Sequence, residues 1–429
     1  MNSRVAVAVS GGRDSMALLH CLATAAQPHG VEVWALHVHH GLQAQADEWV
    51  AFVERTCKRW ASKGLPLHFA MQRLSGKPAR GQSVEAWARA GRYAALAAMA
   101  REAGCDVIAL AHHRADQAET FLLQALRGAG AAGLASMPAS AVRDGITWVR
   151  PWLEQPREAI EAYVHTHRIR HVDDASNADP RFARNRLRVG VMPALRAAFP
   201  DADAALADAA MRAARASELI GEIARADVGT VCEKDVLLLE RWRQLSNVRR
   251  RECLRAWLAP HTERGVTEAL LDRLQHELPG AKPARWPFDG GELRRYRGHV
   301  TAVALRTNVT ALLPCAAFVN DVGTYAVPGQ EATLRVTSVK TGGLPLALLH
   351  NATWRAREAA QQFQRAAATP PRSLKKQFQS AGVPAWSRDA PLLISEDGQL
   401  LLVPGLGTDA RALAVPGRPR VSLAWVAGR

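Results

Sequence analysis

The residues best suited to chemistry stand near the start of the chain, in the string Ser10-Gly11-Gly12-Arg13-Asp14-Ser15. An apolar run, Val5–Val9, precedes this string and an amphipathic run, Met16–Ala25, follows it, so a strand should feed a glycine-rich turn that opens a helix. Backbone N–H groups and the positive end of the helix dipole then point at one place where an anion can bind. The two serines add hydroxyl donors, and Asp14 can hold a Mg²⁺ that neutralises phosphate charge. The string is therefore predicted to bind phosphate.

Two other phosphate-binding loops are excluded by spacing. No G-x-x-x-x-G-K-[ST] string occurs, so the lysine of a Walker-type NTPase is missing. A G-x-G-x-x-G string does occur at residues 128–133, but it follows a helical run, residues 119–127, rather than a strand. We interpret it as the end of a helix and a loop.

The densest polar cluster after this string contains His112, Asp116 and Glu119. On a helix these positions are i, i+4 and i+7, which lie on one face. Such a face can hold a metal, hold a substrate, or be ordinary solvated surface. The histidines of residues 37–40 also suggest zinc, but no partner set completes a tetrahedral site. The position of the 112–119 cluster after an apolar run favours a functional role.

The elements that must position these groups alternate between apolar strands and helices, which predicts an α/β fold with a doubly wound parallel sheet. The expected strands are Val5–Val9, Val31–His37, Leu67–Met71, Asp106–Ala111 and a fifth near Thr147–Val149. The expected helices are Met16–Ala25, Ala44–Lys63, Val84–Ala103 and Asp116–Leu126. Ligands of such sheets bind at the carboxyl ends of the strands, so the phosphate string and both histidine segments should converge there.

Three domains are expected along the chain. Residues 1–200 form the catalytic domain, Asp201–Ala226 a connector helix, residues 227–341 a small helical domain with a β extension, and residues 342–429 a small α+β domain. Within the last two, we expect a helix at 248–258 and strands at Leu293–Leu305, Leu334–Val339 and Leu400–Val403. The last strand follows Glu396-Asp397-Gly398, a turn typical of hairpins.

Composition predicts a cytoplasmic protein that does not enter the membrane. The 429 residues contain no apolar run near the roughly 18 to 20 residues of a membrane span, and the first strand follows Met1 too closely for a secretory signal. The six cysteines form no C-x-x-C pair, which excludes the usual zinc-ribbon spacing and argues against sulfur transfer.

The charge of the chain predicts a nucleic-acid partner. The net charge is +15, and residues 281–429 hold 19 Lys and Arg against 9 Asp and Glu. A positive field of this kind favours a polyanion, because neutralising phosphates releases condensed counterions. Its concentration in the last third indicates that much of the binding surface lies outside the catalytic domain.

Taken together, the motifs resemble the tRNA(Ile)-lysidine synthetases of the PP-loop ATP-pyrophosphatases. The resemblance rests on segments in the same order along nearly the whole chain, at residues 10–15, 37–43, 83–93, 112–120, 126–134, 174–188, 372–389 and 403–406. Two positions depart from the family pattern: His39 stands where the family commonly has Asn, and Ala115 where it commonly has an acidic residue.

The resemblance implies an adenine-nucleotide-hydrolase-like catalytic domain and a reaction. ATP adenylates the C2 carbonyl oxygen of the wobble cytidine in a CAU anticodon of isoleucine tRNA, and the ε-amine of free L-lysine displaces AMP to give lysidine. The string Ser10–Ser15, Arg13 included, would then bind ATP, with Asp14 as the Mg²⁺ ligand and His112 at the α-phosphate or the activated oxygen. Asp116 and Glu119 suit an ammonium group and Arg92 a carboxylate, so these three are expected to bind lysine.

The catalytic residues expected are Asp14, His112, Asp116 and Glu119, with Asp116 as the base for the attacking amine and Glu119 as its rival. Contacts with tRNA are expected from Arg184, Arg186, Arg188, Arg372, Lys375, Lys376 and Arg388. The assembly is left open, with a homodimer among the options.

Three alternatives remain beside this hypothesis. One is a PP-loop enzyme that thiolates cytidine or uridine, which the missing C-x-x-C pair argues against. Another is an amide-forming ligase on a small metabolite, which would need a nucleophilic cysteine that Met1-Asn2 does not offer. The third is an RNA-binding protein without activity, which would leave Asp14, Asp116 and Glu119 unexplained.

Overall fold

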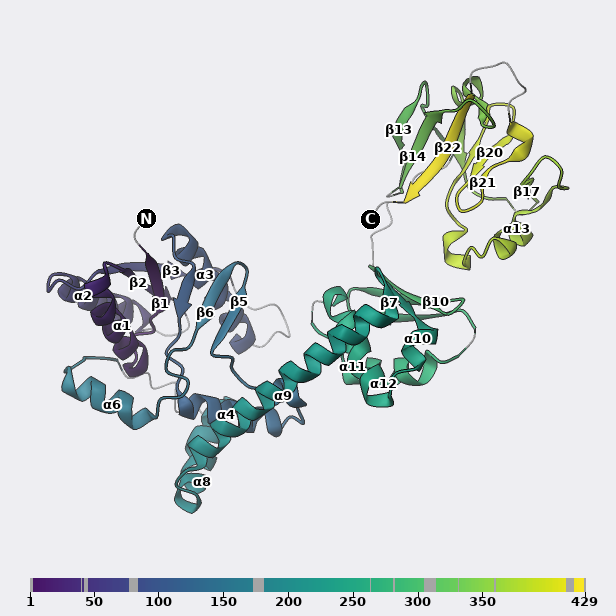
Figure 1. Cartoon of the computed structure of the whole chain (residues 1–429). Coiled ribbons are helices and arrows are strands. Elements are labelled where there is room, and N and C mark those ends of the chain that lie inside the picture. Colours follow the sequence, from purple (N-terminus) through teal and green to yellow (C-terminus); the bar gives the residue numbers. More distant parts are fainter. Residues whose placement is uncertain are drawn as a thin grey trace. The chain divides into compact units, whose positions relative to one another are not determined.

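The computed structural model describes residues 3–39, 41, 45–76, 84–172, 181–262, 264–280, 282–304, 314–330, 332–358, 360–413 and 420–427. These residues divide into two compact units, Met1–Ile223 and Ala224–Arg429 (Figure 1). No described helix is both long and apolar enough to cross a membrane.

The sheet of the first unit confirms the predicted parallel fold. Its strands are β1 (Arg4–Ala8), β2 (Glu32–His39), β3 (Leu67–Arg73), β4 (Val107–Ala109), β5 (Ser140–Arg143) and β6 (Ile146–Val149). They lie in the order β3-β2-β1-β4-β6-β5, and the pairs from β3 to β6 are parallel. The edge strand β5 pairs antiparallel with β6 and was not predicted, since its four residues are mostly exposed and carry no apolar pattern.

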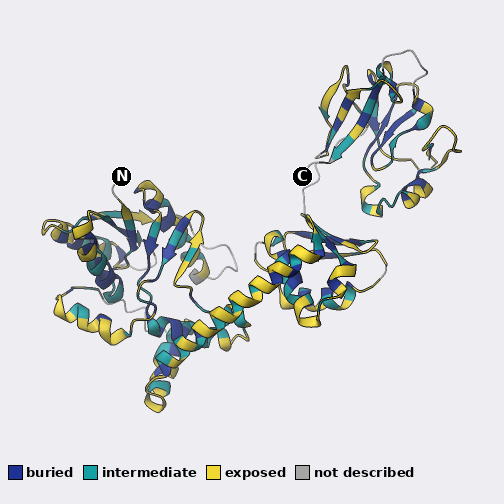
Figure 2. Ribbon diagram, viewed as in Figure 1, coloured by how far each residue is buried: buried dark blue, intermediate teal, exposed yellow. Residues whose placement is uncertain are grey.

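Helices cover both faces of this sheet because successive residues of β1 point to opposite sides. Val7 packs with α1 (Arg13–Ala26), α2 (Ala46–Ala61) and α6 (Arg157–Thr166), whereas Ala6 packs with α3 (Val84–Glu102). Figure 2 shows the buried strands between these layers. The doubly wound arrangement is as expected.

The strand order places a crevice beside β1. The chain passes from β1 to β2 on one side and returns to β4 on the other, so the carboxyl ends of β1, β2 and β4 are neighbours. Open α/β sheets bind ligands at such a reversal. The phosphate string follows β1, His39 ends β2, and residues 110–113 follow β4.

The prediction that His112 shares a helix face with Asp116 and Glu119 is wrong. Helix α4 runs from Arg114 to Ala125 with the extended residue His113 as its N-cap, so His112 lies in the loop before it. The side chain of Asp116 accepts a hydrogen bond from the His113 backbone N–H at 3.0 Å, and this capping contact begins the helix at that point.

The remaining elements of the first unit are helical, and the last of them, α9, continues past Ile223 into the second unit. The elements are α5 (Ala131–Leu134), α7 (Ala183–Arg186), a π-helical turn over Leu187–Val191, α8 (Met192–Ala198) and α9 (Ala202–Val231). Residues 128–130 follow the end of α4 and begin at Gly128 with φ +72°, so they are a helix end and loop as interpreted, whereas residues 131–133 already belong to α5. Helix α9 begins one residue later than the expected connector helix and ends five residues after it.

The second unit begins with a mixed domain. It contains α10 (Leu239–Arg243), α11 (Asn247–Leu258) and α12 (Glu268–Glu277) packed on a five-stranded sheet in the order β7-β8-β11-β10-β9. Its strands are β7 (Cys232–Glu233), β8 (Val236–Leu238), β9 (Ala284–Phe288), β10 (Gly291–Tyr296) and β11 (His299–Ala304). The expected single strand Leu293–Leu305 is instead a hairpin, because Arg297 and Gly298 both take positive φ and turn the chain.

The C-terminal domain packs two sheets on each other, in the orders β12-β16-β19-β20-β21 and β13-β14-β22-β15, with a β17-β18 pair beside them. Its elements are β12 (Cys315–Ala316), β13 (Gly323–Ala326), β14 (Ala332–Ser338), β15 (Leu344–Pro345), β16 (Thr353–Arg355), β17 (Gln362–Phe363), β18 (Arg372–Ser373), α13 (Leu374–Ser380), β19 (Leu392–Ile394), β20 (Leu400–Val403), β21 (Gly407–Thr408) and β22 (Arg420–Ala427).

The expected boundary at 341/342 is wrong. Strand β14 pairs along its length with β22, so residues 315–341 belong to the C-terminal domain and the boundary falls between Ala304 and Pro314. By contrast, β20 occupies the expected residues, and the turn before it is a hairpin in which Gly398 has φ +81°.

Candidate active site

A cavity of about 620 Å³ opens at the carboxyl ends of β1, β2 and β4. Most of the residues predicted for ATP and lysine line it, and these are Ser10, Gly12, Arg13, Asp14, Ser15, Arg92, His112, Asp116 and Glu119. The fold thus brings together groups that are about 100 positions apart in the sequence.

The phosphate string forms a tight loop over the start of α1. Gly11 has φ +91°, and a Cβ at this position would lie 3.0 Å from the Val172 side chain, so glycine is required on both counts. The Ser10 and Ser15 hydroxyls lie 3.1 Å apart, and the Ser15 hydroxyl donates to the Gly12 carbonyl at 2.9 Å. These contacts hold the loop in shape, and the N-terminus of α1 borders the cavity.

Asp14 is ionised at neutral pH. Burial alone would raise its pKa, but contacts with His113 and Arg13 outweigh burial and lower the pKa to about 2. Arg13 Nε lies 2.8 Å from Asp14 Oδ1, and the same guanidinium pairs with Glu161 of α6. A carboxylate fixed in this way beside a phosphate loop is a suitable ligand for a divalent cation.

His113 links the loop to α4. Its Nε2 lies 3.6 Å from Asp14 Oδ2 and 3.5 Å from Asp116 Oδ2. Burial lowers the pKa of His113, but the two carboxylates outweigh it and the net shift is upward. Sequence reasoning singled out His112 and missed His113, although the two are adjacent.

A pH-dependent contribution to stability follows from this raised pKa. The contribution is fully present below the unfolded-state value of about 6.5 and is lost as pH rises through the higher folded-state value. The loss of unfolding free energy in a His113→Gln variant should therefore be larger at pH 5.5 than at pH 9, as measured by urea unfolding. His165→Gln, on exposed α6, is the matched control. A His113→Gln deficit that does not change with pH would contradict the assignment.

His112 is neutral and its tautomer is set by a neighbour. Burial lowers its pKa to about 3; Asp116 opposes this shift, and the Arg150 guanidinium adds to it. Arg150 Nε donates to His112 Nδ1 at 3.3 Å, so the proton of the neutral ring is on Nε2. His112 thus offers an N–H donor on the cavity wall.

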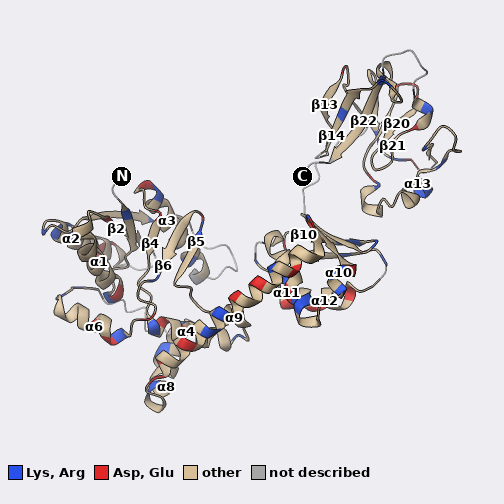
Figure 3. Ribbon diagram, in the orientation of Figure 1, with Lys and Arg blue, Asp and Glu red and all other residues tan. Residues whose placement is uncertain are grey.

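Asp116 and Glu119 form a charge network with two arginines. Arg184 Nε donates to Glu119 at 2.9 Å and its Nη2 to Asp116 at 3.2 Å, while Arg188 Nε donates to Glu119 at 2.7 Å and its Nη2 to Asp116 at 3.1 Å. The Glu119 side chain is only 2% exposed. Two guanidiniums thus lie against two carboxylates at the edge of the cavity. Figure 3 shows the mixed charges at α4.

This network places Arg184 and Arg188, predicted for tRNA, against the carboxylates predicted for lysine. The π-helical turn after α7 lets both arginines face α4, and Leu187 between them packs against Ala118. Arg186 is exposed, and its Nη1 donates to the Arg181 carbonyl at 2.9 Å.

Arg92, on α3, also lines the cavity. Its guanidinium lies 5.7 Å from the centre of the Tyr93 ring, and no carboxylate among the described residues pairs with it. Desolvation lowers its pKa, and the nearby Arg89 and Arg184 add to the shift.

The two departures from the family pattern also line the cavity. Neither ring nitrogen of the buried His39 makes a hydrogen bond, although Nε2 lies 3.2 Å from Asp47 Oδ1. Ala115 is buried at the start of α4 beside Asp116. Trp49 of α2 lines the same end of the cavity as His39.

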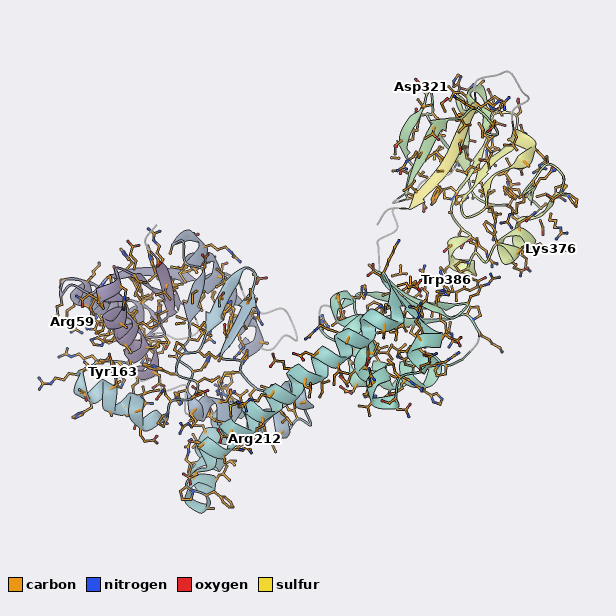
Figure 4. All side chains as sticks on the ribbon, viewed as in Figure 1. Arg59, Tyr163, Arg212, Asp321, Lys376 and Trp386 are labelled. Carbon is orange, nitrogen blue, oxygen red and sulfur yellow. The ribbon has the colours of Figure 1, made fainter. Side chains whose placement is uncertain are left out.

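The residues predicted for tRNA in the C-terminal domain gather around β18 and α13. Arg372, Lys375 and Lys376 are exposed, and Figure 4 labels Lys376 on α13. Arg388 is half-buried, and its guanidinium donates twice to the Val383 carbonyl, at 2.8 and 2.6 Å.

Comparison with known proteins identifies the family. The tRNA(Ile)-lysidine synthase of Ralstonia nicotianae is 38% identical over 424 residues, which cover 96% of this chain and 90% of that protein. This chain belongs to the tRNA(Ile)-lysidine synthase family. The Burkholderia mallei synthase is 37% identical, covering 94% of this chain and 89% of its own, and the Bordetella bronchiseptica synthase is 43% identical, covering 70% and 89%.

Three family models match successive parts of this synthase-family chain. A PP-loop domain matches residues 1–195, a TilS substrate binding domain residues 237–301, and a TilS substrate C-terminal domain residues 352–425. The first confirms that the N-terminal part of the chain is a PP-loop domain, which belongs to an ATP-using family. The other two fall within the mixed domain and the C-terminal domain.

Two residues of the site, His113 and Arg150, were missed from sequence. His113 has a local signal, because a residue preceding Arg-Ala-Asp at a strand end is a natural N-cap position. Arg150 has no such local signal in the sequence. It follows β6 and reaches His112 only because β6 pairs with β4.

Proposed function

We propose that this protein forms lysidine on isoleucine tRNA. It adenylates O2 of the wobble cytidine in a CAU anticodon with ATP and then joins free L-lysine to C2. The observation that carries the proposal is one cavity in which a PP-loop, a neutral histidine N–H donor and two fixed carboxylates meet. The family membership and the basic C-terminal third support a tRNA substrate.

The phosphates of ATP bind at the PP-loop. The donors are backbone N–H groups at the start of α1, which borders the cavity. In the structure the Ser10 and Gly12 N–H groups donate to the Ser15 and Ser10 hydroxyls at 3.2 and 3.3 Å, so a phosphate would exchange with these contacts. Mg²⁺ fits this site, because Asp14 is an ionised carboxylate there and Mg²⁺ commonly uses one or two protein carboxylates together with substrate phosphates. When bound, it would offset the negative charge of the leaving pyrophosphate.

Adenylation is a displacement at the α-phosphorus. Cytidine O2 forms a bond to this phosphorus as the bond to the β-phosphate oxygen breaks and pyrophosphate leaves. His112 donates its Nε2–H to an α-phosphate oxygen or to O2, and Arg150 keeps the ring in the donating tautomer. The ring needs no proton change because it is neutral at working pH.

Lysine transfer uses Arg92 and the two carboxylates that line the cavity. Arg92 binds the lysine carboxylate, and Asp116 and Glu119 attract its ammonium groups. Asp116 takes one proton from the ε-ammonium, the freed amine attacks C2, and the C2–O2 bond breaks to release AMP. Because Arg184 and Arg188 hold these carboxylates in the structure, an incoming amine exchanges with part of their contacts.

The tRNA binds through more than the catalytic domain. Arg372, Lys375 and Lys376 form an exposed basic surface of the second unit that suits backbone phosphates, and Arg186 is a separate exposed arginine of the first unit. Arg388 serves mainly to hold its own loop, through the Val383 carbonyl.

Replacement of Arg92 by alanine should raise the KM for lysine about 10- to 100-fold, the range expected for losing a charge-assisted contact with a carboxylate. The KM for ATP should change little. Lysine-dependent AMP release at fixed tRNA and ATP measures both. Arg101→Ala, near the end of the same helix, is the control, and equal lysine KM values for the two variants would rule out this role for Arg92.

The function is tested by following nucleotide products. Wild-type protein should convert ATP to AMP and pyrophosphate only when a CAU-anticodon tRNA is present, and lysine should accelerate AMP release. A thiolating enzyme would need a sulfur donor instead of lysine, and a protein that only binds RNA would leave ATP intact. Either result would overturn the proposal.

A further inference from the structure

A second basic cluster borders the cavity around Tyr93. The guanidinium carbons of Arg89, Arg92 and Arg143 lie 5.5, 5.7 and 5.6 Å from the centre of the Tyr93 ring. Arg89 and Arg92 come from α3 and Arg143 from β5, so the fold joins positions that are over 50 residues apart. We call Arg89, Arg143 and Tyr93 the Tyr93 cluster.

Within the part of the chain that the structure describes, no carboxylate balances the positive charge of this cluster. Among the described residues, no Asp or Glu lies within ion-pair distance of Arg89 or Arg143, whereas Arg184 and Arg188 each contact two carboxylates. Both Arg89 and Arg143 are exposed. Guanidiniums gathered on one ring repel one another, so the arrangement favours an anionic ligand.

The Tyr93 ring packs against a buried aromatic side chain. Its centre lies 4.8 Å from that of the ring of Trp148, which is only 3% exposed. A fixed aromatic ring with guanidiniums around it suits RNA, in which phosphates alternate with bases that stack.

The cluster is continuous with the reaction site. Tyr93 and the adjacent Arg92 line the cavity, and Arg150, which sets the His112 tautomer, follows the hairpin that carries Arg143. An RNA strand that inserts one base into the cavity must therefore pass its neighbouring nucleotides close to this rim.

We propose that Arg89 and Arg143 bind backbone phosphates of the RNA strand next to the target cytidine, with Tyr93 as a stacking surface for a flanking base. This inference rests on the proposed function, because it assumes an RNA substrate. It assigns to the catalytic domain an RNA contact distinct from the basic surface of the C-terminal domain.

The test measures binding of a CAU anticodon stem-loop RNA to the full chain by fluorescence anisotropy at several salt concentrations. Arg89→Ala and Arg143→Ala should each weaken binding about 3- to 10-fold and should each lower the slope of log K against log salt by about 1. Arg143→Lys should keep the slope, since it keeps the charge. ATP affinity should stay at the wild-type value in all variants.

Arg59→Ala is the matched control, because Arg59 is an exposed arginine of α2 (Figure 4). Thermal unfolding of each variant at the wild-type temperature shows that the fold is intact. If Arg89→Ala and Arg143→Ala bind the RNA like Arg59→Ala, with the same salt slope, the inference is wrong while the proposed function stands. If wild-type protein binds no RNA, both are wrong.

Discussion

Replacement of Asp14 by asparagine is expected to lower the rate of AMP formation about 100- to 1,000-fold, the range found when one group that stabilises transition-state charge is removed. Asp14 is the ionised carboxylate at the PP-loop, and contacts with Arg13 and His113 keep its pKa at about 2. Asparagine keeps the size of the side chain and removes its charge, so Mg²⁺ would lose its protein ligand. Rapid-quench assays of AMP and pyrophosphate with saturating tRNA measure the loss.

A control separates this chemical role from a role in folding. His113→Gln removes a partner of Asp14 but leaves the carboxylate, so it should retain much more activity than Asp14→Asn. The unfolding temperatures of both variants check that the first unit remains folded. Equal activity of Asp14→Asn and wild-type protein across Mg²⁺ concentrations would show that Asp14 is not the metal ligand.

Replacement of Asp116 by asparagine is expected to abolish lysine transfer while some adenylation remains. The base for the amine is removed, but the PP-loop and His112 are intact. Single-turnover experiments should show adenylated tRNA accumulating, with lysidine formation reduced at least about 100-fold, as expected for loss of a general base. Lysidine formation at the wild-type rate would contradict the assignment.

The Glu119→Gln variant distinguishes the role of Glu119 from that of Asp116. Glu119 is almost fully buried between Arg184 and Arg188, so removing its charge should lower the free energy of unfolding by about 1–3 kcal/mol. Because Asp116 is more exposed, Asp116→Asn should lower the free energy of unfolding by a smaller amount. If Glu119→Gln keeps lysine transfer where Asp116→Asn loses it, Asp116 is the base; the opposite result assigns that role to Glu119.

The PP-loop was predictable from sequence because its signal is local. The strand, the positive φ of Gly11 and the start of α1 all lie within about ten residues, and each constrains the next. The parallel, doubly wound character of the sheet was predictable from the alternation of strands and helices, whereas the order of its strands was not predicted. The start of α4 was not predicted correctly, because the Asp116 contact that caps the helix is a side-chain detail that helical spacing does not reveal.

The partners of Asp116 and Glu119 could not be predicted because they are distant in sequence. Arg184 lies 65 residues after Glu119, and the packing of α7 and the following π-helical turn on α4 brings them together. The prediction of the domain boundary at 341/342 was wrong for a similar reason. Strands β13 and β14 look like an extension of the preceding domain until β22, about 90 residues later, pairs with β14.

The central claim is that one cavity joins lysine to the wobble cytidine. The direct measurement incubates the protein with ATP, labelled lysine and a CAU-anticodon tRNA transcript, and then maps the label by nuclease digestion. The account predicts label on the wobble cytidine alone, with one AMP and one pyrophosphate formed for each lysine joined. Absence of label at that cytidine, or label elsewhere in the tRNA, would contradict it.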